Sequence, residues 1–170
     1  RGTTLRESII KILDRLHPKK IVIVSSAPQI RYPDFYGIDM SRIGDFIAFQ
    51  ACVALHHERH TDGMLHTVYN ECREMLDKGD IAPDRNPVRR LYAPFTAEEL
   101  SEKMAQLLRP EGVTTPITLV FQSIEGLHRA IPNHPGDWYF TGHYPTPGGL
   151  RLLLASYVEW YEKQHRESSD

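Results

Sequence analysis

The opening residues Arg1-Gly2-Thr3-Thr4 place a positive charge, a flexible glycine and two hydroxyl groups directly before an apolar segment with helical spacing. A loop that leads into a helix in this way leaves backbone N–H groups unpaired at the positive end of the helix dipole, where phosphate is the usual ligand. Thr4 and Glu7 also have the spacing of a capping box, which predicts where the helix begins. These residues predict an anion site, and an ordinary capped surface helix is the alternative.

The second candidate region is the loop over residues 27–39, whose two prolines and one glycine prevent regular structure along its whole length. This loop follows a β-branched segment that predicts a strand over residues 20–26. Ligands of open α/β sheets bind beyond the carboxyl ends of such strands. Four side chains of the loop are therefore candidates to face a site: Arg31, Tyr32, Asp34 and Tyr36. The alternative for each of them is packing or solvation of the loop.

The histidines of residues 56–60 raise the question of a metal site, because His56 and His60 lie one helical turn apart. The residue four positions after His57 is Thr61, so the zinc motif H-E-x-x-H is absent. We therefore expect a solvated helix end, where histidines suit the helix dipole, and no metal site.

The hydrophobic pattern predicts a mixed α/β chain that begins with the second half of a βαβ unit. The predicted helices cover residues 5–16, 41–60, 63–78, 96–108, 123–131 and 150–165, and the predicted strands cover residues 20–26 and 117–121. A second capping box, Thr96 with Glu99, opens the fourth of these helices. We expect the second and third helices to form an antiparallel pair, the first strand to be buried on both faces, and residues 79–94 to form an exposed connector.

The charge balance argues against two classes of partner. Lys and Arg number 20 against 22 Asp and Glu, and the resulting net charge of -2 provides no field that would attract nucleic acid or an anionic membrane. No apolar segment approaches the roughly 20 residues that a membrane helix needs. Cys52 and Cys72 form no C-x-x-C motif, and we expect both to be reduced thiols of a cytoplasmic protein.

Four blocks of the sequence point to one family. They are Arg1-Gly2-Thr3-Thr4, residues 26–40, the segment F-Q-S-I-E-G-L at residues 121–127 and the segment F-T-G-H-Y-P-T at residues 140–146. These blocks resemble, in the same order, the glutamine phosphoribosylpyrophosphate amidotransferases, which contain a type I phosphoribosyltransferase core and the loop D-D-S-I-V-R-G-T-T. The resemblance covers about residues 1–48 and 96–149 and leaves residues 49–95 without a counterpart.

The resemblance implies that Arg1, Gly2, Thr3 and Thr4 bind the 5′-phosphate of phosphoribosyl pyrophosphate, which agrees with the helix-start argument above. In this family glutamine is hydrolysed in an N-terminal domain, and the ammonia displaces pyrophosphate to give phosphoribosylamine in the first step of purine synthesis. The paired aspartates that hold the ribose hydroxyls and Mg²⁺ would precede Arg1, as would the glutaminase nucleophile. We therefore expect a C-terminal fragment with no catalytic residue and no metal ligand, inactive alone, whose intact parent is a homo-oligomer.

Iron–sulfur members of the family carry cysteines at the places of Asp34, Gly136 and Tyr139. Iron–sulfur clusters are held by thiolates, and none of these three residues supplies one. The comparison with the family therefore predicts that the parent protein has no iron–sulfur cluster.

Three segments follow from the resemblance. Residues 1–48 would complete a Rossmann-like phosphoribosyltransferase core, residues 49–95 would form a helical insertion and connector, and residues 96–170 would form a helix–strand–helix region with a C-terminal helix. One alternative is a non-catalytic oligomerisation or nucleotide-sensing module of a diverged paralogue, with the apolar faces of the insertion as its contact surface. The other alternative is a phosphoribosyltransferase without a glutaminase domain.

Overall fold

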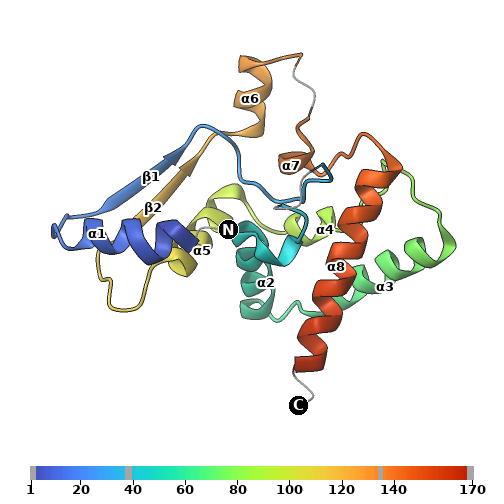
Figure 1. Ribbon diagram of the computed structural model, residues 1–170, viewed down its shortest axis with the longest axis horizontal. Helices are drawn as coiled ribbons and strands as arrows, with labels where there is room; N and C mark the ends of the chain where they lie inside the picture. Colours follow the sequence, from blue (N-terminus) through green and yellow to red (C-terminus); the bar gives the residue numbers. More distant parts are fainter. Residues whose placement is uncertain (1–2, 37–39, 134–135, 168–170) are drawn as a thin grey trace.

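The computed structural model describes residues 3–36, 40–133 and 136–167 and shows two parallel strands beside a group of helices (Figure 1). The predicted mixed α/β class is confirmed. The elements are a π-helical turn Leu5–Ile9, α1 Ile10–Asp14, β1 Ile21–Ser25, a 3₁₀ turn Ile43–Asp45, α2 Ile47–Glu58, α3 Gly63–Lys78, α4 Arg89–Tyr92, α5 Ala97–Leu108, β2 Ile117–Phe121, α6 Ile124–Ala130, α7 Trp138–Thr141 and α8 Pro147–Glu167. None of the helices in the described ranges is long and apolar enough to span a membrane.

The strands β1 and β2 pair in parallel, with Ile21 opposite Ile117 and Ser25 opposite Phe121. The chain from β1 to β2 passes through α2 to α5, and α5 packs against one face of the pair. The prediction that β1 is buried on both faces is wrong, because Val22 and Val24 are 46% and 72% exposed. These two side chains point away from α5, and no described element covers them.

The first helix is also less buried than its pattern predicts. Of its apolar residues only Ile10 is fully buried, whereas Ile12 is 58% exposed and Leu16, just beyond the helix, is 74% exposed. An amphipathic pattern shows which side chains form the apolar face of a helix. That face is buried only where a second element packs against it. In Figure 1 α1 lies along the strand pair, on the side of the molecule away from α3 and α8.

The core lies among α2, α3, α5 and α8, and it includes residues of all three predicted segments. The expected antiparallel α2–α3 pair is wrong, because α2 packs mainly on α5 and α3 packs mainly on α8. Phe49 of α2 meets Tyr157 of α8 edge to face, with ring centroids 6.0 Å apart, and the Tyr157 hydroxyl donates to the Leu65 carbonyl at 2.9 Å. Cys52 and Cys72 are free, as predicted, and the structure places both of them in the core.

This packing bears on the predicted contact surface of residues 49–95. The apolar faces of α2 and α3 are buried inside the chain by α5 and α8. These apolar faces, which suggested an oligomerisation surface, pack against other helices of the same chain. They therefore give no support to that alternative.

The connector over residues 79–94 is not exposed throughout, which corrects the prediction. Val88 and Leu91 are fully buried, Tyr92 is 3% exposed, and the short helix α4 lies within this segment. Asn86 fixes the segment, since its amide nitrogen donates to the Gly142 carbonyl at 2.8 Å and its oxygen accepts from the Val88 amide. Prolines and charges signalled a loop, but they carry no information on whether that loop packs on the core.

His56 is buried rather than solvated, which also corrects the prediction. It is 1% exposed, and its Nε2 lies 2.8 Å from the Leu91 carbonyl while its Nδ1 lies 2.8 Å from Thr61 Oγ1. A carbonyl can only accept, so Nε2 carries the proton and Nδ1 accepts from the hydroxyl. No group of His, Cys, Asp and Glu residues within the described ranges is arranged to hold a metal ion.

We predict that His56 makes stability depend on pH. Burial lowers the pKa of His56 below its ordinary value of 6.5. At mildly acid pH the imidazole is therefore protonated in the unfolded chain and still neutral in the folded chain. Stability from this residue is therefore complete above about pH 6.5 and is lost as the pH falls towards the folded pKa. Urea unfolding between pH 7.5 and 5.5 should show a steeper loss for the native protein than for His56→Gln, which keeps a donor near Leu91.

His143→Gln is the matched control, because the side chain of His143 is exposed. Equal pH slopes for the native protein and His56→Gln would contradict the assignment of the buried neutral imidazole. At neutral pH the His56→Gln protein should lose about 1–3 kcal/mol, since one buried partner is no longer satisfied.

Candidate functional site

The structure places Thr3 and Thr4 at the start of the first helix, where the phosphate prediction needs them. Arg1 and Gly2 lie outside the described residues. Both threonines are exposed, and the helix continues as a π-helical turn over Leu5–Ile9, at whose end the Ile10 amide donates to the Leu5 carbonyl. π-Helical turns are rare and occur often at functional sites. Beside the turn lies a depression of about 440 Å³, lined by Thr3, Arg6, Glu7, Asp45, Ile47, Gln50, Leu107 and Leu108.

The predicted capping box of Thr4 and Glu7 is wrong. Thr4 already has helical backbone angles, φ -62° and ψ -40°, and its side chain makes no cap. A capping residue needs extended angles so that its oxygen can turn back to the next amides. Thr96 shows the contrast, since its angles of -75° and 161° place it in the predicted box with Glu99. At the first helix Glu7 instead pairs with Lys11 at 3.0 Å.

The four candidate side chains of the loop after β1 do not converge on one site. Tyr32 is 2% exposed and packs edge to face on Tyr92, whereas Tyr36 is 77% exposed. Asp34 accepts from the Tyr36 amide at 3.0 Å and pairs with the Tyr139 hydroxyl. Arg31 differs from these three, because it lines a second and larger cleft.

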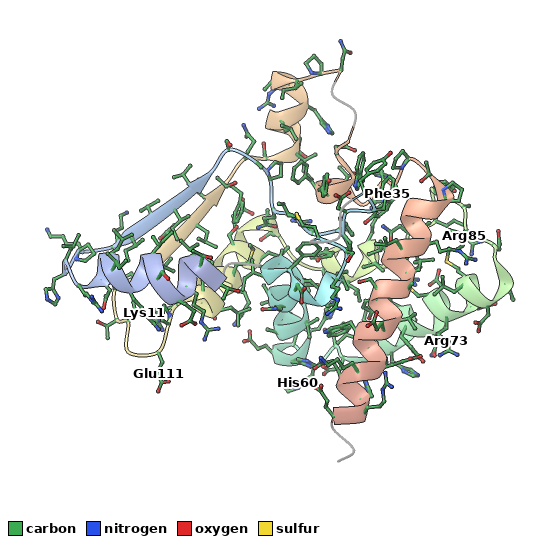
Figure 2. All side chains as sticks on the ribbon, viewed as in Figure 1. Lys11, Phe35, His60, Arg73, Arg85 and Glu111 are labelled. Atoms are coloured by element: carbon green, nitrogen blue, oxygen red, sulfur yellow. The ribbon has the colours of Figure 1, made fainter. Side chains whose placement is uncertain are left out.

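The loop after β1 is held by the segment that contains α7. The backbone amides of Arg31 and Tyr32 both donate to the Tyr139 carbonyl, at 2.8 and 3.1 Å. Burial, together with the hydrogen bond from its hydroxyl to Asp34, raises the pKa of Tyr139 above its ordinary value. Phe35 packs on Trp138 with ring centroids 5.2 Å apart, and Figure 2 shows it close to the start of α8. Asp34 and Tyr139 are thus in contact, and these are two of the three positions at which the resemblance places cysteines in iron–sulfur proteins.

The larger cleft has a volume of about 840 Å³ and extends along the whole of β2, from Ile117 to the residues just beyond its carboxyl end. It is bounded by the loop that leaves β1, by α5, by β2 and by the start of α6. The sequence analysis placed a site after β1 but found only Arg31 among the residues that line this cleft. The missed residues come from α5, from β2, from the segment after β2 and from the start of the loop after β1, and no local pattern shows that these segments line one cleft.

Comparisons with known proteins identify relatives of part of the chain. It is 47% identical over 49 residues to the amidophosphoribosyltransferases of Pasteurella multocida and Haemophilus influenzae, and 46% identical over 48 residues to that of Escherichia coli. This segment of the chain is related to amidophosphoribosyltransferases. The matched segment is 28–29% of this chain and only 9–10% of the length of each relative. No protein-family model matches the chain, and no solved structure gives a significant match.

Gly142 belongs to the F-T-G block that resembles amidophosphoribosyltransferases, and the structure gives the physical reason for a glycine there. Its φ is +74°, and a Cβ atom would lie 2.8 Å from Tyr32 Cζ and 2.9 Å from Asn86 Nδ2. Three segments therefore meet at a point where only a hydrogen atom fits: the loop after β1, the start of the α4 region and the end of α7.

We predict that Gly142→Ala destabilises the chain by about 3 kcal/mol, from the combination of left-handed backbone strain and overpacking. Gly63→Ala is the matched control, because a Cβ atom at Gly63 would have nothing within 4 Å. Urea unfolding should show a large loss for the first variant and almost none for the second. A Gly142→Ala protein as stable as the native one would show that the three segments do not meet as described.

Proposed function

We propose that this chain is part of an amidophosphoribosyltransferase, with a partial Rossmann-like type I phosphoribosyltransferase core. In the reaction proposed for the intact enzyme, ammonia from glutamine displaces pyrophosphate from phosphoribosyl pyrophosphate and forms phosphoribosylamine. The observation that carries this proposal is the 47% identity over 49 residues to enzymes of that name. The parallel β1–β2 pair, joined through helices, supports the α/β core.

Within this proposal the residues Arg1, Gly2, Thr3 and Thr4 bind the 5′-phosphate. The exposed position of Thr3 and Thr4 in the first described turn of the helix supports the assignment, because helix starts attract anions and both threonines lie at the surface. Hydrogen bonds to a charged group contribute about 1.5–3 kcal/mol each. A phosphate held here would leave the reacting C1 carbon of the ribose to residues outside this chain.

We predict that Thr4→Val in the intact enzyme lowers kcat/KM for phosphoribosyl pyrophosphate about tenfold or more, since one charge-assisted hydrogen bond is lost. Thr114→Val is the matched control, because Thr114 is exposed and lies in the loop before β2. Steady-state kinetics with ammonia as the nitrogen donor would isolate the transferase step. Equal losses in the two variants would remove Thr4 from the phosphate site.

The 170-residue chain alone should be inactive. The acidic residues expected to hold Mg²⁺ and the ribose hydroxyls are not among its residues, and with them most of the electrostatic stabilisation of the transition state is absent. The measurement is pyrophosphate release from phosphoribosyl pyrophosphate with Mg²⁺ and ammonia. Turnover by this chain would show that its own residues supply the catalytic contacts.

We also propose that the intact enzyme has no iron–sulfur cluster. The contact between Asp34 and Tyr139 supports this, because an aromatic and hydrogen-bonded connection joins the two segments at the places of the family cysteines. Iron and acid-labile sulfide assays on the aerobically and anaerobically purified parent should both give less than one equivalent per chain. Stoichiometric iron and sulfide would contradict the proposal.

A further inference from the structure

The cleft along β2 and α5 is separate from the depression beside Thr3. Its volume of about 840 Å³ lies in the range of small-molecule sites. One end of the cleft reaches the segments that follow β1 and β2, beyond the carboxyl ends of the strands, where ligands of parallel α/β sheets bind. The strand residues Leu119 and Phe121 supply apolar lining, and α5 supplies polar side chains. The proposed phosphate residues do not line this cleft.

Arg31 is held in place at this cleft by neutral groups. Gln29 Oε1 accepts from Arg31 Nε at 3.2 Å and from Nη2 at 2.8 Å, and the Arg31 guanidinium lies 5.2 Å from the centre of the Tyr92 ring. Gln29 is itself fixed, since it is 4% exposed and its amide donates to Ala97 O and Ser101 Oγ, each at 2.8 Å. The cation is therefore oriented before any ligand binds.

The guanidinium of Arg31 forms no ion pair with a carboxylate of the described residues, whereas several other arginines do. Arg59 and Arg73 each bond a carboxylate of the chain, as do Arg85 and Arg90. In the described ranges Arg31 instead contacts only Gln29 and the Tyr92 ring with its guanidinium. A partly buried guanidinium whose partners are all neutral keeps its full attraction for an anionic oxygen.

The remaining lining favours a carboxylate over a phosphate. Glu98, Glu102 and Glu125 line the cleft together with Arg31 and Arg109, so two positive charges stand against three negative ones and a dianion is disfavoured. Two of the amides at the start of α5 that a phosphate would use, those of Thr96 and Glu99, are already occupied by the capping box. We infer that this cleft binds a small molecule with a single carboxylate on an apolar body, and that Arg31 is the residue that recognises the carboxylate.

The test is an NMR titration of the 170-residue chain with sodium butyrate, butyramide and inorganic phosphate, each used as a probe. Butyrate should shift the Arg31 Nε–H and Gln29 side-chain signals saturably. Butyramide and phosphate should leave them unchanged, because the first lacks the charge and the second carries too much of it. Arg31→Gln should weaken butyrate binding at least tenfold. Arg129→Gln should bind as the native chain does, because Arg129 is an exposed residue of α6 outside the cleft.

Circular dichroism and thermal unfolding would check the fold of each variant. Arg31→Lys, which keeps the charge without the forked geometry, tests the same point if Arg31→Gln does not fold, and it should weaken butyrate binding severalfold. Butyrate binding that is indifferent to Arg31, the absence of saturable binding, or tighter binding of phosphate would each overturn the inference. None of these results would affect the proposed transferase, which is measured as kcat/KM of the intact enzyme.

Discussion

The anchoring of the loop that follows β1 is the constraint on which the cleft beside β2 depends. The Tyr139 carbonyl accepts two of its amides, the Tyr144 hydroxyl donates to the Pro33 carbonyl at 2.6 Å, and the Tyr92 hydroxyl donates to the Arg31 carbonyl at 3.0 Å. These partners lie far from the loop in sequence. Backbone groups of a buried loop need such partners, because an unpaired buried carbonyl or amide costs about as much as a lost hydrogen bond. The result is a rigid wall for the cleft and a fixed direction for Arg31.

The elements that the sequence predicted well are those whose signals are local. The helix over residues 63–78 and the strand over residues 117–121 have the predicted bounds, and the helix after Thr96 begins at the predicted capping box. In each case a few neighbouring residues contain the whole signal: a glycine after the last turn, a β-branched run between prolines and polar residues, or the reciprocal bonds of a cap. The order of helices and strands, and with it the α/β class, could therefore be read from the chain.

Most of the errors have a common physical origin, since they concerned what a segment packs against. His56 and Leu91 are both buried because residues 79–94 fold back onto α2, and neither histidines nor prolines in a sequence reveal such a contact. The cleft was predicted only in part for the same reason. Arg31 was a candidate from its place after a strand, whereas the role of Gln29 depends on α5, a helix that begins about seventy residues later. Thr4 failed as a cap because its backbone angles, not its residue type, decide whether an oxygen can reach the next amides.

The exposed apolar residues of the strand pair bear on the proposed enzyme. Two parallel strands with one open face are below the number that is usually stable alone, and the apolar side chains of Val24, Leu16 and Ile12 are all exposed. Larger parallel sheets bury such side chains on both faces, which is the arrangement that the sequence of β1 favours. The matched segment is about a tenth of each amidophosphoribosyltransferase, so those enzymes contain ample chain to form a larger sheet. The sequence of β1 is apolar on both faces, but the structure covers only one of them. This difference supports the proposal that the chain functions as part of a longer enzyme.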